Sequence, residues 1–314
     1  MRLERYFKKP VAILFGYHDM GCAGLQSLLE AEYNVVAVFT HRNSDSEEIF
    51  FDSVAGQAEK LSIPVFFPDN VNESQCVELI KQLKPDYLFT LSYRQELTEE
   101  ITQAATFGAH NIHASLLPAY RGRSHLNWVI INGEKHTGVT LHRVTRQKDA
   151  GPILAQAKVT IEKHDNALSL HKKLVQMTRA RLPEWLRGLQ QGTLIERIQD
   201  ERLASCPGAR QPDDGLINWK KSAIEIHNLI RGITYPWPGA YTMAGKKKLI
   251  IWESCIKESF SESQPGTIIS LDPLLIACGV GVLEVKRGMC GEVRDSEAGA
   301  IVRELKAHCG MLLV

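Results

Sequence analysis

The stretch PVAILFGYHDMGCAGLQSLLEAEYNVVAVFT, residues 10–40, decides the fold class of this chain. Residues 10–15 are almost continuously apolar, which predicts a buried strand. A turn containing glycine follows, and three leucines between residues 25 and 29 then recur at the spacing of one helix face. Residues 35–40 repeat the strand pattern. A strand, a helix and a second strand in this order predict parallel strands joined by a crossover helix.

The same alternation continues outward from this stretch. Further strand patterns lie at residues 64–67, 87–91, 108–113, 139–143 and 153–161, and helical patterns at residues 58–61, 77–83, 124–132 and 167–189. We therefore expect an α/β fold with a Rossmann-like, mostly parallel sheet that has helices on both faces. Ligands of such open sheets bind outside the carboxyl ends of the strands.

A change of composition divides the chain. Residues 202–214 are rich in proline, glycine, alanine and aspartate, which predicts a linker between an N-terminal domain at 1–201 and a C-terminal domain at 215–314. The C-terminal part has a helical pattern at residues 223–231, a Pro-Trp-Pro-Gly turn at 236–239 and several short strand patterns. These predict a small β-rich, barrel-like domain.

Composition excludes several classes of protein. The 314 residues carry a formal charge of +1, so no overall basic field favours nucleic acid. No apolar run is long enough to insert into a membrane, and the apolar run after the basic N-terminus is too short for a signal peptide. The seven scattered cysteines form no CxxC pair, which argues against a metal site and a disulfide framework and favours the cytoplasm.

Two nucleotide-binding motifs are also missing from the sequence. The glycines at 16, 21 and 24 read GxxxxGxxG rather than GxGxxG, and no acidic residue ends the second strand pattern, so we expect no NAD. A glycine turn that lets helix and sheet pack closely explains this spacing better. No GxxxxGK[ST] motif occurs.

Asn111, His113 and Asp149 fit one type of chemistry. When an amine attacks an acyl carbon, an amide donor stabilises the oxyanion and an imidazole moves the protons. A carboxylate beside the imidazole fixes its tautomer and raises its pKa. The two-residue spacing of Asn111 and His113 puts both side chains on one side of an extended segment. The Asn-x-His pattern by itself fits a hydrogen-bonded strand end equally well.

Two motifs make a family resemblance. Residues 111–118, NIHASLLP, followed by Tyr-Arg-Gly at 120–122, resemble the NxHxSLLPxxxG signature of formyltransferases that use 10-formyltetrahydrofolate, and Asp-Ala-Gly at 149–151 resembles their DxG motif. The chain looks most like the subgroup that formylates UDP-4-amino-4-deoxy-L-arabinose during lipid A modification and polymyxin resistance. Segments at 17–22, 68–72, 126–128, 138–143, 236–240 and 273–279 carry that closer likeness.

The resemblance implies roles for individual residues. His113 would transfer protons, Asn111 would stabilise the oxyanion, and Asp149 would raise the pKa of the histidine. The 10-formyltetrahydrofolate co-substrate would be bound by Gln95, Glu96, Leu97, Arg123, Thr145, Arg146, Gln147 and Lys148. The C-terminal domain would be an oligonucleotide-binding-like barrel, with the nucleotide sugar near the domain junction. Formation of a homo-oligomer is left open.

The sequence departs from the pattern of the family it resembles at two places. Ala114 replaces the usual glycine, which matters only if this residue needs a positive φ. Ser124 and His125 replace the usual Ala-Pro, which adds a titratable group near Arg123. Bifunctional members of the family that this chain resembles carry a second, oxidative decarboxylase domain after the formyltransferase. Because the sequence contains no dinucleotide-binding fingerprint for such a domain, we interpret the chain as a stand-alone enzyme or an excised part of a bifunctional one.

Three alternatives share parts of this interpretation. A methionyl-tRNA formyltransferase would have the same catalytic residues, but the segment 42–48 is short and acidic and would repel phosphates. A formyltransferase for another UDP- or dTDP-linked 4-amino sugar would carry the same signature motifs and is the second alternative. A catalytically inactive module that binds folate or nucleotide is the alternative from another class, and it would have no use for Asn111, His113 and Asp149 together.

Overall fold

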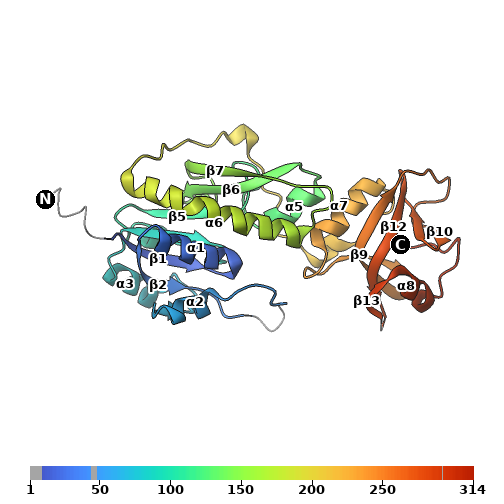
Figure 1. The fold of residues 1–314 in the computed structure, drawn as a ribbon, viewed down its shortest axis with the longest axis horizontal. Helices are drawn as coiled ribbons and strands as arrows, with labels where there is room; N and C mark the ends of the chain where they lie inside the picture. Colours follow the sequence, from blue (N-terminus) through green and yellow to red (C-terminus); the bar gives the residue numbers. More distant parts are fainter. Residues whose placement is uncertain (1–8, 44–47, 292) are drawn as a thin grey trace. The chain divides into compact units, whose positions relative to one another are not determined.

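The computed structural model describes residues 9–43, 48–291 and 293–314 (Figure 1). Two compact units make up the structure. The first comprises the chain up to residue 122 together with 137–160 and 172–207, and the second comprises 123–136, 161–171 and 208–314. The chain therefore passes from one unit to the other several times before residue 208.

A seven-stranded sheet forms the centre of the first unit. Its strands are β1 (Val11–Gly16), β2 (Asn34–Phe39), β3 (Val65–Phe66), β4 (Tyr87–Leu91), β5 (Ala109–His113), β6 (His136–Arg143) and β7 (Ile153–Thr160). Their order is β3-β2-β1-β4-β5-β6-β7. The pairs from β3 to β5 are parallel, whereas β6 runs antiparallel to β5. This confirms the expected Rossmann-like, mostly parallel sheet.

Helices cover both faces of this sheet (Figure 1). The helices of this unit are α1 (His18–Glu30), α2 (Val54–Lys60), α3 (Ser74–Gln82), α4 (Glu99–Thr102) and most of α6 (Ala167–Gln191). On one face α6 packs against α1, where the Thr178 hydroxyl lies 3.6 Å from the Met20 sulfur. On the other face α3 and α4 pack apolar residues such as Ile80 and Ile101 against Phe15 of β1. None of the helices in the described residues is long and apolar enough to span a bilayer.

In its described residues, the second unit is an antiparallel β-structure with helices packed against it. Its elements are α5 (His125–Ile131), α7 (Ala223–Ile233), β8 (Ala240–Ala244), β9 (Lys247–Lys257), β10 (Ile268–Leu271), β11 (Leu274–Ala277), β12 (Val282–Cys290), β13 (Val293–Glu297) and α8 (Ala298–Leu305). The strand order is β10-β11-β12-β9-β8, and β13 pairs with β12. The expected β-rich C-terminal part is confirmed, and Trp237 of the Pro-Trp-Pro-Gly turn packs against its core.

The C-terminal residues connect the two edges of this second sheet. Val314 and Met243 exchange main-chain hydrogen bonds of 2.7 and 2.9 Å beside β8. At the other edge the Ile268 N–H donates to the Met311 carbonyl at 2.8 Å. The last four residues therefore link β8 to β10, which gives the sheet its barrel-like form.

Several elements have little signal in the sequence. β8, β13 and α8 are five to eight residues long, and α5 lies between strands of the first sheet in sequence but belongs to the second unit. There α5 packs closely against α7, because the Asn127 amide donates to the Gly232 carbonyl at 2.7 Å. A Cβ on Gly232 would lie 2.8 Å from Ile131, so this contact requires glycine. Two short 3-10 turns, Glu201–Leu203 and Pro212–Gly215, lie at the ends of the predicted linker.

Candidate active site

Strand β5 carries both Asn111 and His113 in its second half. His113 is the last residue of the strand, and Ile112 between them is buried. Successive side chains of a strand point to opposite faces, so Asn111 and His113 share a face. The register places Asn111 beside Thr90 of β4 on one side and His142 of β6 on the other. Both predicted residues are therefore held within a regular sheet rather than on a loop.

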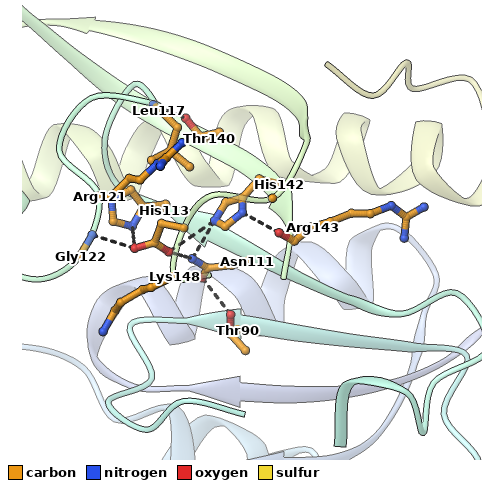
Figure 2. A network of polar contacts seen from close by, with 12 residues as sticks. Thr90, Asn111, His113, Leu117, Arg121, Gly122, Thr140, His142, Arg143 and Lys148 are labelled. Carbon is orange, nitrogen blue, oxygen red and sulfur yellow. Dashed lines mark hydrogen bonds and ion pairs between the residues drawn. The ribbon is translucent and has the colours of Figure 1, made fainter. Parts of the chain in front are cut away.

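The Asn111 amide is fixed by three partners (Figure 2). Its Oδ1 accepts a hydrogen bond of 2.8 Å from the Thr90 hydroxyl. Its Nδ2 donates to Asp149 Oδ1 at 3.1 Å and to His142 Nε2 at 3.0 Å. The amide is therefore oriented with its N–H groups toward Asp149 and His142, and an oxyanion would have to replace one of these two acceptors.

His142 is a member of the site that was not predicted. Its Nδ1 lies 2.8 Å from the Arg143 carbonyl, which can only accept, so Nδ1 carries the proton and Nε2 is left to accept from Asn111. The side chain is 1% exposed. The available signal was its register, since an antiparallel β6 that places His113 opposite Thr140 also places Asn111 opposite His142.

His113 has a partner on each ring nitrogen. Nε2 lies 2.8 Å from the Tyr120 carbonyl and therefore donates to it, which leaves Nδ1 to exchange protons. Nδ1 lies 3.7 Å from Asp149 Oδ2. Burial lowers the pKa of His113 below its usual 6.5, although the charge of Asp149 and the hydrogen bond to Tyr120 raise it. The charge of Asp149 acts on the pKa in the expected direction, but desolvation of the imidazolium outweighs it, so the net shift of the pKa is downward.

Asp149 joins the two catalytic candidates through one carboxylate. Oδ1 accepts from Asn111, and Oδ2 accepts from the Gly122 N–H at 2.8 Å. Burial favours the neutral acid, but the charge of His113 when protonated and the hydrogen bond from the Gly122 N–H lower the pKa of Asp149. The carboxylate is therefore ionised at neutral pH, and it can stabilise the imidazolium that forms when His113 takes up a proton.

The DxG motif has a geometric reason. Asp149 adopts a φ of 51°, a left-handed conformation that aspartate tolerates better than most residues. A Cβ on Gly151 would lie 2.0 Å from the Arg143 carbonyl oxygen, so only glycine fits there. On the other side of the carboxylate, Gly122 needs glycine for its φ of 87°. The motif residues thus bring Asp149 back over the end of β5.

Comparison with known proteins assigns this chain to a family. Residues 9–186 match the formyl transferase family, and residues 210–294 match the formyl transferase C-terminal domain. The chain belongs to the formyl transferase family.

Solved structures share the fold of this formyltransferase. The N-formyltransferase from Helicobacter canadensis, in complex with folinic acid and dTDP-3-aminofucose, is 20% identical with a TM-score of 0.66, covering 88% of this chain and 99% of that one. WlaRD, a sugar 3N-formyl transferase solved with dTDP and 5-N-formyl-THF, is 20% identical with a TM-score of 0.67, covering 88% and 97%. Phosphoribosylglycinamide formyltransferase from Bacillus halodurans is 25% identical with a TM-score of 0.51, covering 59% and 97%.

Hydrogen bonds to the loop at residues 68–72 fix the predicted folate segment at Gln95, Glu96 and Leu97. Gln95 Oε1 accepts from the Val71 N–H at 2.7 Å, and its Nε2 donates to the carbonyls of Pro68 and Asp69. The Glu96 carbonyl accepts from the Asn72 amide at 2.9 Å. The oxygen and the nitrogen of the Gln95 carboxamide therefore both have partners in the neighbouring loop. These hydrogen bonds fix the main chain of residues 95–97.

The second predicted folate segment meets the first in the formyltransferase. Thr145, Arg146, Gln147 and Lys148 are exposed. Lys148 Nζ lies 2.8 Å from Glu96 Oε1, which links the two segments through an exposed ion pair. Arg123, predicted to bind the same ligand, is exposed and is the first residue of the second compact unit.

The structure describes the positions that depart from the family pattern, but only part of the acidic segment at residues 42–48. Ala114 is not among the described residues with a positive φ, so its Cβ causes no backbone strain. Ser124 has a φ of 59° and precedes α5, which begins at His125. Residues 44–47, the centre of the acidic loop that argues against tRNA, lie outside the described residues.

Proposed function

We propose that this formyltransferase transfers the formyl group of 10-formyltetrahydrofolate to the 4-amino group of a nucleotide-linked sugar, UDP-4-amino-4-deoxy-L-arabinose. The observation that carries the reaction type is the shared carboxylate of Asp149, which contacts the Asn111 amide with one oxygen and faces the His113 imidazole with the other. An oxyanion donor and a proton carrier thus lie on the two sides of one buried negative charge. That combination suits an acyl transfer and has no role in a module that only binds.

The proposed mechanism begins with the neutral His113. The sugar amine attacks the formyl carbon, the carbonyl oxygen becomes an oxyanion, and an Asn111 N–H donates to it in place of one of its present acceptors. His113 Nδ1 takes the proton from the amine, and the Asp149 carboxylate stabilises the imidazolium. The imidazolium then protonates the leaving nitrogen of the folate as its bond to the formyl carbon breaks. One formamide bond forms, and tetrahydrofolate leaves with the returned proton.

The donor is proposed to occupy the surface formed by residues 95–97 and 145–148, and a role for Arg123 stays a prediction from the family resemblance. The Glu96 to Lys148 ion pair supports this placement, because it joins segments 52 residues apart in sequence. Relatives of the same fold were solved with folinic acid and 5-N-formyl-THF. Main-chain groups of residues 95–97 would bind the pterin, since the Gln95 side chain is used elsewhere.

The proposed acceptor rests on sequence motifs. A dTDP-linked amino sugar is an alternative acceptor that the solved structures support. Both sugar formyltransferases of similar fold were solved with dTDP or a dTDP sugar; one holds dTDP-3-aminofucose and the other is a sugar 3N-formyl transferase. A dTDP-linked amino sugar is therefore the second candidate. The resemblance of residues 17–22 and 138–143 to the UDP-4-amino-4-deoxy-L-arabinose subgroup favours the first. For either acceptor we place the reaction in the cytoplasm.

One assay separates these acceptors. The protein is incubated with 10-formyltetrahydrofolate and, in separate reactions, UDP-4-amino-4-deoxy-L-arabinose, dTDP-3-aminofucose, a dTDP-linked 4-amino sugar or methionyl-tRNA, and formylated product is measured by mass spectrometry. We expect product with the UDP sugar. Product from a dTDP sugar alone would move the assignment to the second candidate, product from the tRNA alone would reject both, and no product from any acceptor would support an inactive module.

A single variant tests the proton carrier. His113→Ala should lower kcat by about 10²- to 10⁴-fold, the range expected for loss of a general acid and base, and should leave the Kd for folinic acid within about twofold. The exposed His164 provides a matched control, and His164→Ala should retain normal activity. A normal kcat for His113→Ala would contradict the proposed role.

A further inference from the structure

The segment that follows α6, residues 197–205, runs alongside both loops that hold His113. It begins with a pair of antiparallel main-chain hydrogen bonds, each 2.8 Å long, between Arg197 and Ile153 at the start of β7. Its final residue, Ser205, falls in the predicted linker but is hydrogen-bonded to the loop after β5. We call residues 197–205 the strap.

Gln199 connects the strap to the DxG turn. Its Nε2 donates to the carbonyl of Asp149 at 2.8 Å and to the carbonyl of Gly151 at 2.7 Å. The side chain is buried, with 5% of the residue exposed. Both N–H groups of one carboxamide are thus used to hold the main chain on either side of Ala150, at the turn where Asp149 has a φ of 51°.

Arg121 carries the connection across to the second loop. Gln199 Oε1 accepts from Arg121 Nε at 3.1 Å and from Nη2 at 2.8 Å. The same guanidinium makes two hydrogen bonds, of 2.9 and 2.8 Å, to the carboxylate of Glu201. Arg121 is 6% exposed, and a bidentate pair of this kind fixes the guanidinium plane. The strap therefore holds the loop of residues 118–122 by a buried side chain.

Ser205 holds the same loop by its main chain. Its hydroxyl accepts from the Tyr120 N–H at 2.8 Å, and its carbonyl accepts from the Arg121 N–H at 2.8 Å. Tyr120 has a φ of 61°, which is uncommon for a bulky residue and needs such support. The Tyr120 carbonyl is the acceptor for His113 Nε2.

The strap thus contacts the two loops that contact His113. One loop supplies the Tyr120 carbonyl to Nε2, and the other supplies the Asp149 carboxylate to Nδ1. We infer that Gln199, Arg121 and Ser205 are positioning residues, which set the orientation of the His113 imidazole between Tyr120 and Asp149. The inference that these residues affect turnover rests on the proposed formyl transfer. The inference that they affect the ionisation of His113 is independent of that proposal.

Loss of a positioning residue lowers the reaction rate, whereas loss of a purely structural residue lowers the stability of the fold. A misplacement of about 1 Å at a reacting group can cost about 10²-fold in rate while the protein stays folded. Gln199→Glu keeps an oxygen for Arg121 but replaces the amide that donates to the Asp149 and Gly151 carbonyls. It therefore leaves the buried arginine paired, but it removes the two hydrogen bonds to the DxG turn and adds a negative charge there. Gln199→Ala removes both connections.

The test measures His113 in two independent ways. NMR titration of the histidines in the free protein gives the pKa of His113, assigned by the loss of its signal in His113→Ala. We expect Gln199→Glu and Gln199→Ala to shift that pKa by at least about half a unit, since about 0.7 kcal/mol of changed interaction suffices. With the accepted sugar, kcat should fall by about tenfold or more while KM for 10-formyltetrahydrofolate changes less than about threefold.

Gln190 offers a matched control. Its Nε2 also donates to a main-chain carbonyl, that of Ala31 at 2.9 Å, near the C-terminal end of α6. Gln190→Ala should leave the His113 titration and kcat unchanged. A folded Gln199→Glu with a normal His113 pKa and normal kcat would overturn the inference. A shifted pKa in a protein that formylates no sugar would uphold the inference and reject the proposed function.

Discussion

The Nε2 atom of His142 lies 3.0 Å from the Nδ2 atom of Asn111, and the carbonyl of Arg143 holds the proton of that imidazole on the opposite nitrogen. Since a neutral imidazole has only one N–H, this arrangement makes His142 an acceptor toward the site. It turns the Asn111 amide so that nitrogen, rather than oxygen, faces the region where an oxyanion would form. Thr90 reinforces the same orientation from the other side of the amide.

Replacement of His142 should therefore impair the oxyanion donor. In His142→Phe the Asn111 amide loses an acceptor, so we expect kcat to fall by about tenfold or more, against the 10²- to 10³-fold typical of losing an oxyanion donor itself. His142→Gln, which can place an oxygen near the former Nε2, should recover part of the loss. Steady-state kinetics with the accepted sugar provide the measurement. Equal rates for His142→Phe and the wild type would show that Asn111 needs no such orientation.

The pH dependence follows from the ionisation of His113. Burial lowers its pKa below 6.5, and a general base must be neutral, so kcat/KM should fall with decreasing pH only below that value. In Asp149→Asn the charge that raises the pKa is lost, and the acidic limb should move to still lower pH as kcat falls. Full pH profiles of both proteins test this. An acidic limb above pH 7 in the wild type, or an upward shift in Asp149→Asn, would contradict it.

His110 should make the fold sensitive to acid. The side chain is 0% exposed beside Phe89, and neither ring nitrogen has a hydrogen-bond partner among the described residues. Burial lowers its pKa to about 3, and the charge of Arg143 acts in the same direction. The unfolded chain binds a proton below pH 6.5 and the native state does not, so the free energy of unfolding should fall by roughly 1.4 kcal/mol per pH unit between about 6.5 and 3.

An apolar replacement tests this directly. His110→Leu should raise the free energy of unfolding at pH 7.5 by about 1 kcal/mol, because a buried polar group without partners is removed. It should also reduce the acid dependence by one proton, measured by urea unfolding at several pH values. A separate contribution from His227, whose pKa burial and Arg231 lower to about 4, should remain. A less stable His110→Leu protein with unchanged pH dependence would show that the imidazole has partners in solution.

Gly151 should tolerate no side chain. A Cβ there would lie 2.0 Å from the Arg143 carbonyl oxygen, so Gly151→Ala must displace main chain next to Asp149. We expect a loss of more than about 2 kcal/mol in the free energy of unfolding, together with loss of turnover. Gly56 in α2 is the matched control, because its added Cβ would meet only Ser53 at 3.7 Å. Gly56→Ala should be neutral or stabilise by about 0.5–1 kcal/mol. Thermal unfolding of both variants measures the contrast.

Much of the fold and part of the site could be predicted from sequence because they rest on local patterns. The apolar run at residues 10–15 and the leucines that follow it predict a strand and a helix by their spacing alone. The two-residue spacing of Asn111 and His113 predicts a shared face for the same reason. Strand β8 and helix α8 were missed, because each is short and gains its stability from the barrel core around it.

The sequence by itself determined the α/β fold and the family motifs, since both depend on residue types at fixed spacing, and it indicated Asn111, His113 and Asp149 as candidate catalytic residues. Only the tertiary structure decided the orientation of these groups. His142, Tyr120 and Gln199 enter the site through strand register and through loops that meet after long stretches of chain. The tertiary structure also decided the direction in which the pKa of His113 is shifted, because desolvation of the imidazole depends on all the atoms packed around it. The sequence shows only that the charge of Asp149 is available to act against this desolvation.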